Sequence, residues 1–485
     1  MPAERDYGAT SPPASSSSST LQNTTRHLPT KDGHASVTSS VTNLTNTIVG
    51  AGALAFPSAF ASMGIIPGVI SCAFSAVTAM FGLYLLSRCA SVVGTRPGEE
   101  GRKASFNEVA RLTFGKGWAT RAFDLAIAIK CFGVSVSYLI ICKTLLPQVC
   151  YTLAKLFHHP LPDDSILLAS HFWLFAIMVV IVPLSFLRTL DSLRFTSQIA
   201  LATVVYLVFV VVGWFFIKGV SPTRGEVVLV RFGKNTMSSF PVQVFAYTCS
   251  QNLFPIYNEL QNKSQKRMNT VIGTSIGSAA AVYEVLGIIG YLTFGSNVGS
   301  NVIAMYPPTS LFVALGRFGI VLLVGLSYPL QLLPCRMSLH HLTHGLFKGH
   351  SKVEPSVSAS AEEDSDDEDE SEDDPLVPKV GGDDGHGHSH KHDMHFTKYI
   401  GITVAILATG FAIAYNVHEL EIVLGFVGST GSTIISFILP GFFYFRLFRD
   451  ESGRTKWFAL ALALYGMAVM LFCLTFNILN LVVKK

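Results

Sequence analysis

Ile48-Val49-Gly50-Ala51-Gly52-Ala53-Leu54-Ala55-Phe56-Pro57 decides the fold of this chain, because glycines and a proline interrupt an apolar segment that is long enough to cross a membrane. Glycine and proline weaken helices, and non-helical backbone is tolerated at membrane depth only where it is buried in protein or lines a cavity. The stretch therefore predicts a membrane helix that is broken midway, with a candidate binding site at the break.

The composition of the whole chain is that of a membrane protein. Of its 485 residues, 49% are hydrophobic and 14% are charged, and the mean hydropathy is +0.44, whereas soluble domains carry about 25% charged residues. Eleven apolar segments are long enough to cross a hydrocarbon core of about 30 Å as helices; they cover residues 41–62, 67–90, 123–147, 172–187, 197–217, 240–257, 270–294, 311–334, 399–415, 422–448 and 457–483. The prediction is an all-α polytopic membrane protein with eleven transmembrane helices.

The distribution of Lys and Arg predicts the orientation, because positive residues favour the cytosolic side of a membrane. With a cytosolic N-terminus, the cytosolic loops hold Arg88, Arg96, Arg102, Lys103, Arg111, Lys116, Arg121, Arg188, Arg194, Lys263, Lys266, Arg267, Arg446, Arg449, Arg454 and Lys456. The opposite loops hold only Lys155, Lys218, Arg224, Arg231 and Lys234, with Lys484 and Lys485 at the end. A cytosolic N-terminus and a lumenal C-terminus are therefore expected, and no cleavable signal peptide is recognisable.

A second interrupted segment lies in the sixth predicted span, at residues 245–255 (FAYTCSQNLFP). Aligning the Phe-Pro pairs of the two spans places residues 248–250 opposite residues 50–52. Breaks in spans one and six are what an inverted repeat of five plus five helices requires, because an odd number of spans inverts the second copy. The frequency of Gly and Pro in membrane helices is the simpler alternative. The predicted organisation is a disordered tail at 1–37, repeats at 38–217 and 236–448, and an eleventh helix at 457–485.

The two breaks predict a site for a zwitterion. Unwinding at Gly50, Ala51 and Gly52 frees amides at the positive end of a half-helix, which favours a carboxylate. Carbonyls near Val49 and Tyr247 end the preceding half-helices and favour an ammonium group. We expect an α-amino acid there, with these residues and Thr248, Cys249 and Ser250 forming the substrate site.

Polar and ionisable side chains within the spans are further candidates. Asn46, one turn before the first break, is expected to orient the substrate or a coupling ion, with a hydrogen bond to a neighbouring helix as the alternative. Glu284 is the candidate proton-binding group, unless it pairs with Lys130 or Arg317. Asp124 and Lys143 lie near span ends and are expected to reach the interface.

One long loop separates the eighth and ninth spans. The stretch 345–396 is acidic and His-rich, and this composition predicts a disordered, cytosolic segment. Ser365 and Ser371 each precede an acidic residue by three positions, so an acid-directed kinase is a possible partner, as is an unmodified solvated tract. The weak metal candidates are His386, His388, His390 and His392. The eight cysteines show no framework spacing and are expected to be apolar fillers.

Several segments together resemble the amino acid/auxin permease superfamily, and in particular its fungal vacuolar amino-acid transporters. They are residues 43–52 (NLTNTIVGAG), 131–138 (CFGVSVSY), 183–187 (PLSFL), 190–194 (LDSLR) and 247–259 (YTCSQNLFPIYNE). The resemblance covers the chain from about residue 37 to its end, except for the acidic loop. It implies the leucine-transporter-like fold, amino-acid transport by alternating access, and commonly proton coupling; Tyr138 in the third span joins the expected substrate-binding residues.

The sequence is compatible with more than one coupling ion and more than one class of function. In the wider fold, hydroxyls of the eighth helix hold a sodium ion, often two adjacent ones, whereas here Ser327 stands between Leu326 and Tyr328. A single hydroxyl favours protons, with no other cofactor expected. The first hypothesis is a secondary transporter that exports amino acids from the vacuole; an amino-acid-sensing receptor with little flux and a divalent-metal transporter are the alternatives. An enzyme is not expected, since no set of nucleophile, base and orienting group is recognisable.

Overall fold

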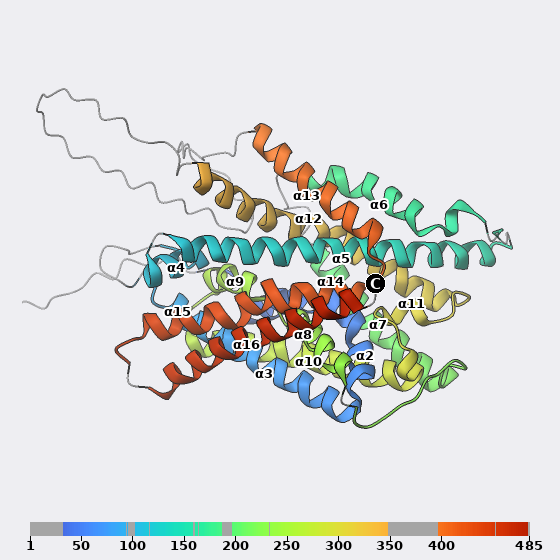
Figure 1. The fold of residues 1–485 in the computed structure, drawn as a ribbon, viewed down its shortest axis with the longest axis horizontal. Coiled ribbons are helices and arrows are strands. Elements are labelled where there is room, and N and C mark those ends of the chain that lie inside the picture. Colours follow the sequence, from blue (N-terminus) through green and yellow to red (C-terminus); the bar gives the residue numbers. More distant parts are fainter. Residues whose placement is uncertain are drawn as a thin grey trace, which may run out of the picture.

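The computed structural model describes residues 33–93, 95, 102–115, 117–158, 161–162, 164–186, 196–231, 233–347, 396–451 and 453–483. The acidic loop, with Ser365, Ser371 and the four candidate histidines, lies outside the described residues, as does most of the predicted N-terminal tail. The described chain forms a bundle whose long helices run roughly along its longest axis (Figure 1).

The bundle is built from α-helices with a few tighter or wider turns. The α-helices are α1 Val37–Ile48, α2 Ala51–Met63, α3 Ile65–Ala90, α4 Phe106–Phe114, α5 Trp118–Leu156, α6 Ser170–Ser185, α7 Thr196–Lys218, α8 Lys234–Ala246, α9 Leu253–Glu259, α10 Gln265–Phe294, α11 Val302–Met305, α12 Leu311–Phe347, α13 Phe396–Asn416, α14 Leu420–Val427, α15 Leu439–Leu447 and α16 Arg454–Val483. The short 3-10 turns are η1 Ile166–Leu168, η3 Ser250–Asn252 and η4 Gly295–Asn297, and two π-helical turns, η6 Gly428–Ser432 and η7 Ile434–Ile438, join α14 to α15.

The structure contains most of the predicted membrane-crossing helices as single long helices. Within the described residues, eight helical segments are long and apolar enough to cross a membrane, and nine if the bent pair α1 and α2 counts as one span. The two other predicted spans correspond to α6, which has 16 residues, and to the divided pair α8 and α9. An all-helical polytopic architecture is therefore confirmed, while the count of eleven stays a prediction.

The helices α5 and α12 form the central pair of the bundle, and both are longer than the sequence suggested. The predicted third span stopped at Pro147 and the eighth at Pro334, but Pro147, Pro329 and Pro334 all lie inside helices. Proline removes one backbone hydrogen bond, and neighbouring helices in a membrane protein can compensate for it. Helix α12 continues beyond these prolines to Phe347, so it extends past the predicted end of the eighth span and into the first residues of the predicted loop at 345–396.

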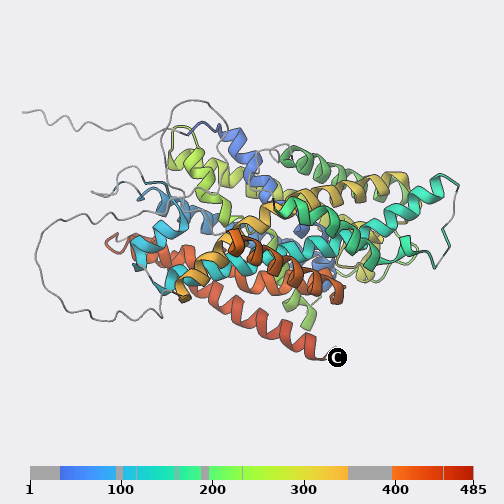
Figure 2. The same cartoon turned by 90° about the horizontal axis from the view of Figure 1, so that it is seen from above.

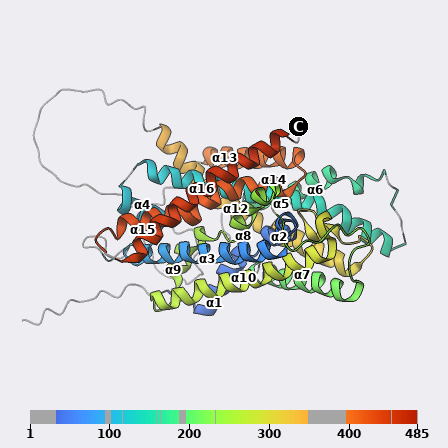
Figure 3. The same ribbon diagram turned by 60° about the horizontal axis from the view of Figure 1, so that its bottom comes forward.

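The outer helices complete the bundle. Helix α16 runs along the outside and ends the described chain (Figure 2). Helix α1 lies beside α10, with which it packs extensively (Figure 3). This placement brings the broken first span against α10, the helix that carries Glu284.

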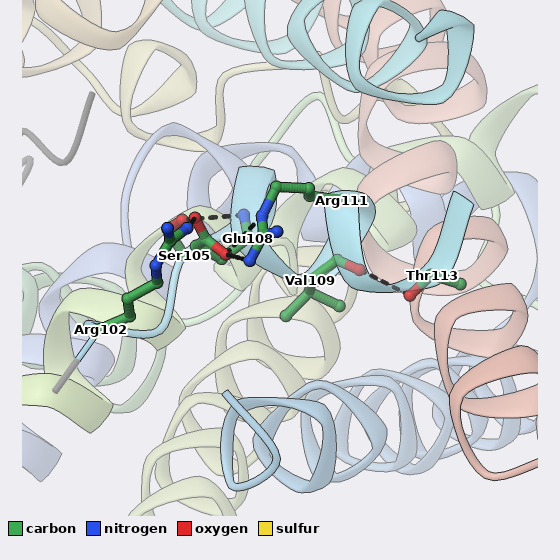
Figure 4. A network of polar contacts seen from close by, with 6 residues as sticks. All are labelled: Arg102, Ser105, Glu108, Val109, Arg111 and Thr113. Carbon is green, nitrogen blue, oxygen red and sulfur yellow. Dashed lines mark hydrogen bonds and ion pairs between the residues drawn. The ribbon is translucent and has the colours of Figure 1, made fainter. Parts of the chain in front are cut away.

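Short helix α4 is fixed by a charged network around Glu108 (Figure 4). Ser105 accepts a hydrogen bond from the Glu108 amide at 3.1 Å and caps the helix. The Glu108 carboxylate binds Arg102 at 2.9 Å and Arg111 at 2.8 Å. Thr113 donates to the Val109 carbonyl at 2.6 Å. Because Glu108 is buried and accepts from two guanidinium groups, the network fixes the orientation of α4 at the end of the bundle.

The segment before α1 is paired with the end of α9. The Ala35 amide donates to the Glu259 carbonyl at 2.8 Å, and the Gln261 amide donates to the Ala35 carbonyl at 2.9 Å. These bonds form an isolated parallel bridge between Ala35 and Leu260. A Cβ atom at Gly33 would lie 2.1 Å from the Glu259 carbonyl oxygen, so the close approach requires glycine. The predicted disordered tail is therefore wrong for residues 33–37, which are ordered by this pairing and by α1.

Lys143 of α5 shows how the fold accommodates a buried cation. Its ammonium donates to the carbonyls of Ala414 and, at 2.8 Å, of Val417, at the C-terminal end of α13. Helix C-termini favour positive charge. Asp124 is also buried and lies 3.6 Å from Nδ1 of His341 on α12. The expectation that Asp124 and Lys143 reach the interface is therefore wrong, because both have partners inside the bundle.

Replacing Lys143 with methionine tests this role. We expect Lys143→Met to lower the free energy of unfolding by about 2 kcal/mol, because two buried carbonyls lose their donor. The measurement is the thermal midpoint of the detergent-purified protein, with Lys155→Met, an exposed lysine on the same helix, as the control. Equal midpoints for the two variants would contradict the capping role.

Candidate functional site

The first break separates α1 from α2. Helix α1 ends at Ile48, Val49 is extended with φ −80° and ψ 103°, and α2 begins at Ala51. The axes of the two helices differ by 55°. The break is therefore at the predicted place, but it covers Val49 and Gly50, whereas the prediction extended it to Gly52. Ala51 and Gly52 already lie in the first turn of α2.

The two glycines at this break have different surroundings. A Cβ atom on Gly50 would have no heavy atom within 4 Å, so Gly50 faces open space. A Cβ atom on Gly52 would lie 2.6 Å from the Cβ and 2.9 Å from the Cα of Ala246. Gly52 therefore allows α2 to pack closely on α8. The space on the side-chain side of Gly52 is therefore filled by α8 and is not open to a ligand.

The N-terminal end of α2 leaves free amide groups beside Gly50. The Ala53 amide donates to the Gly50 carbonyl at 3.1 Å, and Gly50 offers no side chain as a cap. Within the described part of the chain, the amides of Ala51 and Gly52 have no hydrogen-bond acceptor. Amides at a helix start, together with the helix dipole, favour an anion.

The second break separates α8 from α9. Helix α8 ends at Ala246, residues 247–249 are not helical, and η3 leads into α9. All of Tyr247, Thr248, Cys249 and Ser250 are buried. The Thr248 hydroxyl donates to the Val244 carbonyl at 2.7 Å and accepts from Ser436 of η7 at 3.3 Å. The break thus lies where the sequence predicted it, and a π-helical turn packs against it.

Tyr283 of α10 joins the two breaks. Its hydroxyl lies 2.8 Å from the Ile48 carbonyl, at the end of α1, and 3.1 Å from the Ala246 carbonyl, at the end of α8. A phenol has one proton, so it donates to one of these carbonyls at a time. The expected convergence of the two helix ends is therefore present one residue earlier on each helix than the sequence suggested.

Sequence reasoning missed Tyr283. The neighbouring charge of Glu284 drew attention to this point of the helix, and a tyrosine in an apolar span has no distinctive pattern of its own. Its side chain is fully buried, with its ring stacked on Phe56 at 4.3 Å and edge-on to Tyr247 at 5.2 Å. The Tyr247 hydroxyl in turn lies 3.1 Å from the Cys72 sulfur. The available signal was the position of Tyr283, midway along a helix next to an in-span carboxylate.

The two broken spans also meet through polar side chains. Asn252 of η3 donates to the Thr47 hydroxyl of α1 at 2.8 Å. The Asn46 side chain is half-buried and forms no hydrogen bond within the described residues, so the alternative of a hydrogen bond to a neighbouring helix is not present. An amide that is close to the break and has no partner is available to a ligand.

The remaining predicted site residues lie apart from this cluster or lack partners. Tyr138 lies within hydrogen-bonding reach of Gln331 on α12, and no hydrogen bond joins it to either break in the described chain. Ser327 of α12 is half-buried and forms no hydrogen bond with Asn46 among the described residues. No hydrogen bond in the described chain therefore joins these two residues to the helix ends.

Glu284 does not form the expected ion pair. It is half-buried and interacts electrostatically with Cys72 and Tyr247, but it has no ion-pair partner among the described residues. Arg317 instead donates to the carbonyls of Ile303 and Tyr306 around α11, at 3.2 and 2.5 Å. The pairing of Glu284 with Lys130 or Arg317 is therefore wrong.

A small cavity lies beside the first break, between α2, α7 and α12. It is lined by Gly50, Ala51, Ala53, Leu54, Thr203, Val204, Leu207, Ile320, Leu323 and Val324. Thr203 is the only lining residue with a side-chain oxygen, so the cavity offers few ligands to a metal cation. Within the described residues, no group of three or more His, Cys, Asp or Glu side chains is placed to hold a metal ion.

Known proteins resemble this chain in sequence. The chain is 38% identical over 461 residues to vacuolar amino acid transporter 5 of Schizosaccharomyces pombe, with 93% of this chain and 96% of the relative covered. It is 34% identical over 461 residues to vacuolar amino acid transporter 6 of Saccharomyces cerevisiae, with 91% and 98% covered.

Two solved structures share the fold. The complex of MhsT with L-phenylalanine has a TM-score of 0.54 at 10% identity, with 90% of this chain and 98% of that chain covered. The inward-facing conformation of Mhp1 has a TM-score of 0.53 at 13% identity, with 93% and 90% covered. Both similarities extend over nearly the whole chain, so they concern the complete helical bundle.

The family assignment follows from the sequence match as a whole. Residues 33–483 match the model of the transmembrane amino acid transporter protein family, which agrees with the resemblance found in the sequence and with the expectation that the chain is not an enzyme. This chain therefore belongs to the transmembrane amino acid transporter family.

Proposed function

We propose that this protein is a proton-coupled transporter that exports amino acids across the vacuolar membrane to the cytosol by alternating access. The vacuolar location follows from the names of its relatives. The charge distribution of the loops supports a cytosolic N-terminus and a lumenal C-terminus. The substrate binds between the two helix breaks.

The observation that carries the proposal is the position of the Tyr283 hydroxyl. One polar atom lies within hydrogen-bonding distance of both the Ile48 and the Ala246 carbonyl. A substrate ammonium group at this position meets the negative ends of two helices, while its carboxylate meets the free amides of Ala51 and Gly52. The side chain of the substrate is then left to determine selectivity.

The Tyr283 hydroxyl and the substrate ammonium compete for the same two carbonyls. In the substrate-free protein the hydroxyl lies within hydrogen-bonding distance of both carbonyls, donates to one of them at a time, and links the ends of α1 and α8. When an amino acid binds, its ammonium group displaces the hydroxyl and takes over these hydrogen bonds. The exchange links the occupancy of the site to the relative position of the two broken helices, which alternating access requires.

Protons are favoured over sodium as the coupling ion by the cavity beside Gly50. In transporters with broken helices, freed carbonyls and neighbouring oxygen ligands coordinate Na⁺. Here the lining residues from α12 are Ile320, Leu323 and Val324, which have no side-chain oxygen. Ser327, the candidate hydroxyl, is not among the lining residues.

The test is uptake of twenty labelled amino acids, one at a time, into vesicles that contain the purified full-length protein. Proton and sodium gradients are imposed separately at zero membrane potential. We expect a proton gradient alone to drive accumulation of at least one amino acid. Accumulation that requires sodium would overturn proton coupling, and binding without flux under either gradient would favour an amino-acid-sensing receptor.

A further inference from the structure

The long helices α5 and α12 carry four buried basic residues, and three of them have the same kind of partner. Lys143 donates to carbonyls at the end of α13, and Arg317 to carbonyls at the end of α11. Arg336 donates to the Ser185 carbonyl at the end of α6, at 3.3 Å. In each case the cation donates to carbonyls at the C-terminal end of a helix, where the helix dipole favours positive charge.

Lys130 is the exception among these four residues. Its residue surface is 4% exposed, yet it forms no hydrogen bond or ion pair with any residue that the structure describes. Polar groups buried in proteins are nearly always hydrogen-bonded, and an unpaired buried charge is strongly unfavourable. A lysine in this position therefore does not serve to stabilise the fold as Lys143 does.

The position of Lys130 links it to the site. It lies about a third of the way along α5, and its side chain is close to Cys249, inside the second break. On another side, a Cβ atom at Gly431 of the π-helical turn η6 would lie 2.9 Å from the Lys130 amide nitrogen. Lys130 is thus enclosed between two irregular segments, and π-helical turns in other proteins often mark functional sites.

The titratable groups around Lys130 are thiols. Cys131 on its own helix and Cys249 from the break lie close to it, and Cys335 of α12 lies against Ala128, half a turn earlier on α5. The turn η6 carries no titratable residue. Asp124 is directed to His341. Among the described residues, no carboxylate therefore neutralises the Lys130 ammonium in the substrate-free site.

We infer that Lys130 is the residue whose protonation couples proton movement to the transport of the amino acid, an inference that rests on the function proposed above. With no counter-charge in the empty site, Lys130 is neutral when the empty protein closes. A bound amino acid brings a carboxylate between the two breaks, and the loaded protein closes with Lys130 protonated. The protein therefore changes conformation when it carries both the amino acid and the proton, or when it carries neither. This rule is what makes the two move together.

Two variants separate the two protonation states. Lys130→Met keeps the site neutral, so the protein closes whether it is empty or loaded. Lys130→Arg keeps the charge, so the protein closes only when an amino acid is bound. Both variants are studied in vesicles with the full-length protein and an equimolar mixture of twenty labelled amino acids, in three assays: downhill uptake, accumulation driven by a proton gradient, and exchange of internal for external amino acids.

For Lys130→Met we expect downhill uptake that does not respond to pH and no accumulation. Half-saturation should be about tenfold higher, because the substrate carboxylate keeps the Ala51 and Gly52 amides but loses the favourable charge of the Lys130 ammonium. For Lys130→Arg we expect exchange with loss of net uptake by at least about tenfold. Lys143→Met, a buried lysine of the same helix, should lower stability and keep wild-type coupling. A structural role for Lys130 would instead lower all three activities together.

The inference is overturned if Lys130→Met accumulates amino acids in a proton gradient as the wild type does. If Lys130→Met does not fold, the test is the comparison of exchange with net uptake in Lys130→Arg. If that variant loses exchange and net uptake to the same degree, the inference is overturned. Failure of the proposed function is a different result, in which the wild type itself shows no proton-driven flux. The two failures are therefore distinguishable in one set of vesicles.

Discussion

Tyr283→Phe should bind amino acids about tenfold more tightly than the wild type and should show net uptake that is about tenfold slower. The variant keeps the ring stacked on Phe56 but loses the hydroxyl that donates to either the Ile48 or the Ala246 carbonyl. A lost hydrogen bond to a buried carbonyl costs about 1–3 kcal/mol. In the variant, the substrate-free closed protein has unpaired carbonyls and is destabilised by this amount. When an amino acid binds, its ammonium group donates to the carbonyls and removes the destabilisation.

The control for this prediction is Tyr291→Phe on the same helix. Tyr291 is also fully buried, and its hydroxyl accepts a hydrogen bond from the Val228 amide at 3.0 Å, away from both breaks. Its loss should destabilise the protein to a similar degree without changing the ratio of exchange to net uptake. Affinity is measured by isothermal titration and flux in vesicles; equal ratios for the two variants would contradict competition between Tyr283 and the substrate.

Gly52→Val should reduce amino-acid uptake by at least about a hundredfold, because the new side chain forces α2 and α8 apart. Even a single Cβ atom at Gly52 would lie 2.9 Å from the Cα of Ala246, so backbone must move. Ala246 is also the residue whose carbonyl binds Tyr283. Displacing α8 therefore disturbs the stability of the bundle and the geometry of the site at once, and we expect a lower thermal midpoint as well.

Gly277→Val is the matched control for this substitution. Gly277 lies on α10, and a Cβ atom there would have no heavy atom within 4 Å. The same change in volume should therefore cost about 1 kcal/mol or less. The measurements are uptake per folded molecule and thermal midpoint. Normal uptake by Gly52→Val would show that close packing of α2 on α8 is not needed for transport.

The sequence predicted the breaks because their causes are local. Glycine and proline act on their own turn of helix, so Gly50 and the segment around Thr248 could be located without knowledge of the neighbours. The exact limits of the breaks could not be predicted, because they depend on packing between distant parts of the chain. Helix α2 begins at Ala51, and its next residue, Gly52, packs against Ala246.

The roles of the charged residues could not be predicted, because their partners are remote in sequence. Lys143 binds carbonyls more than 270 residues away, and those of Ala414 and Val417 carry no signal in their side chains. Tyr283 is similar, since it binds backbone atoms of two other helices. Hydropathy and charge therefore identified which residues were unusual, while the tertiary contacts decide which of them are satisfied and which, like Lys130, are not.

The pairing of Ala35 with Leu260 connects the N-terminal segment mechanically to the site. A pull on the chain before Gly33 is transmitted through two backbone hydrogen bonds to the end of α9, the half-helix that follows the second break. It also acts directly on α1, which begins at Val37 and ends at the first break. Tension on this segment would therefore reach both broken helices at the same time, without contact with the amino acid between them.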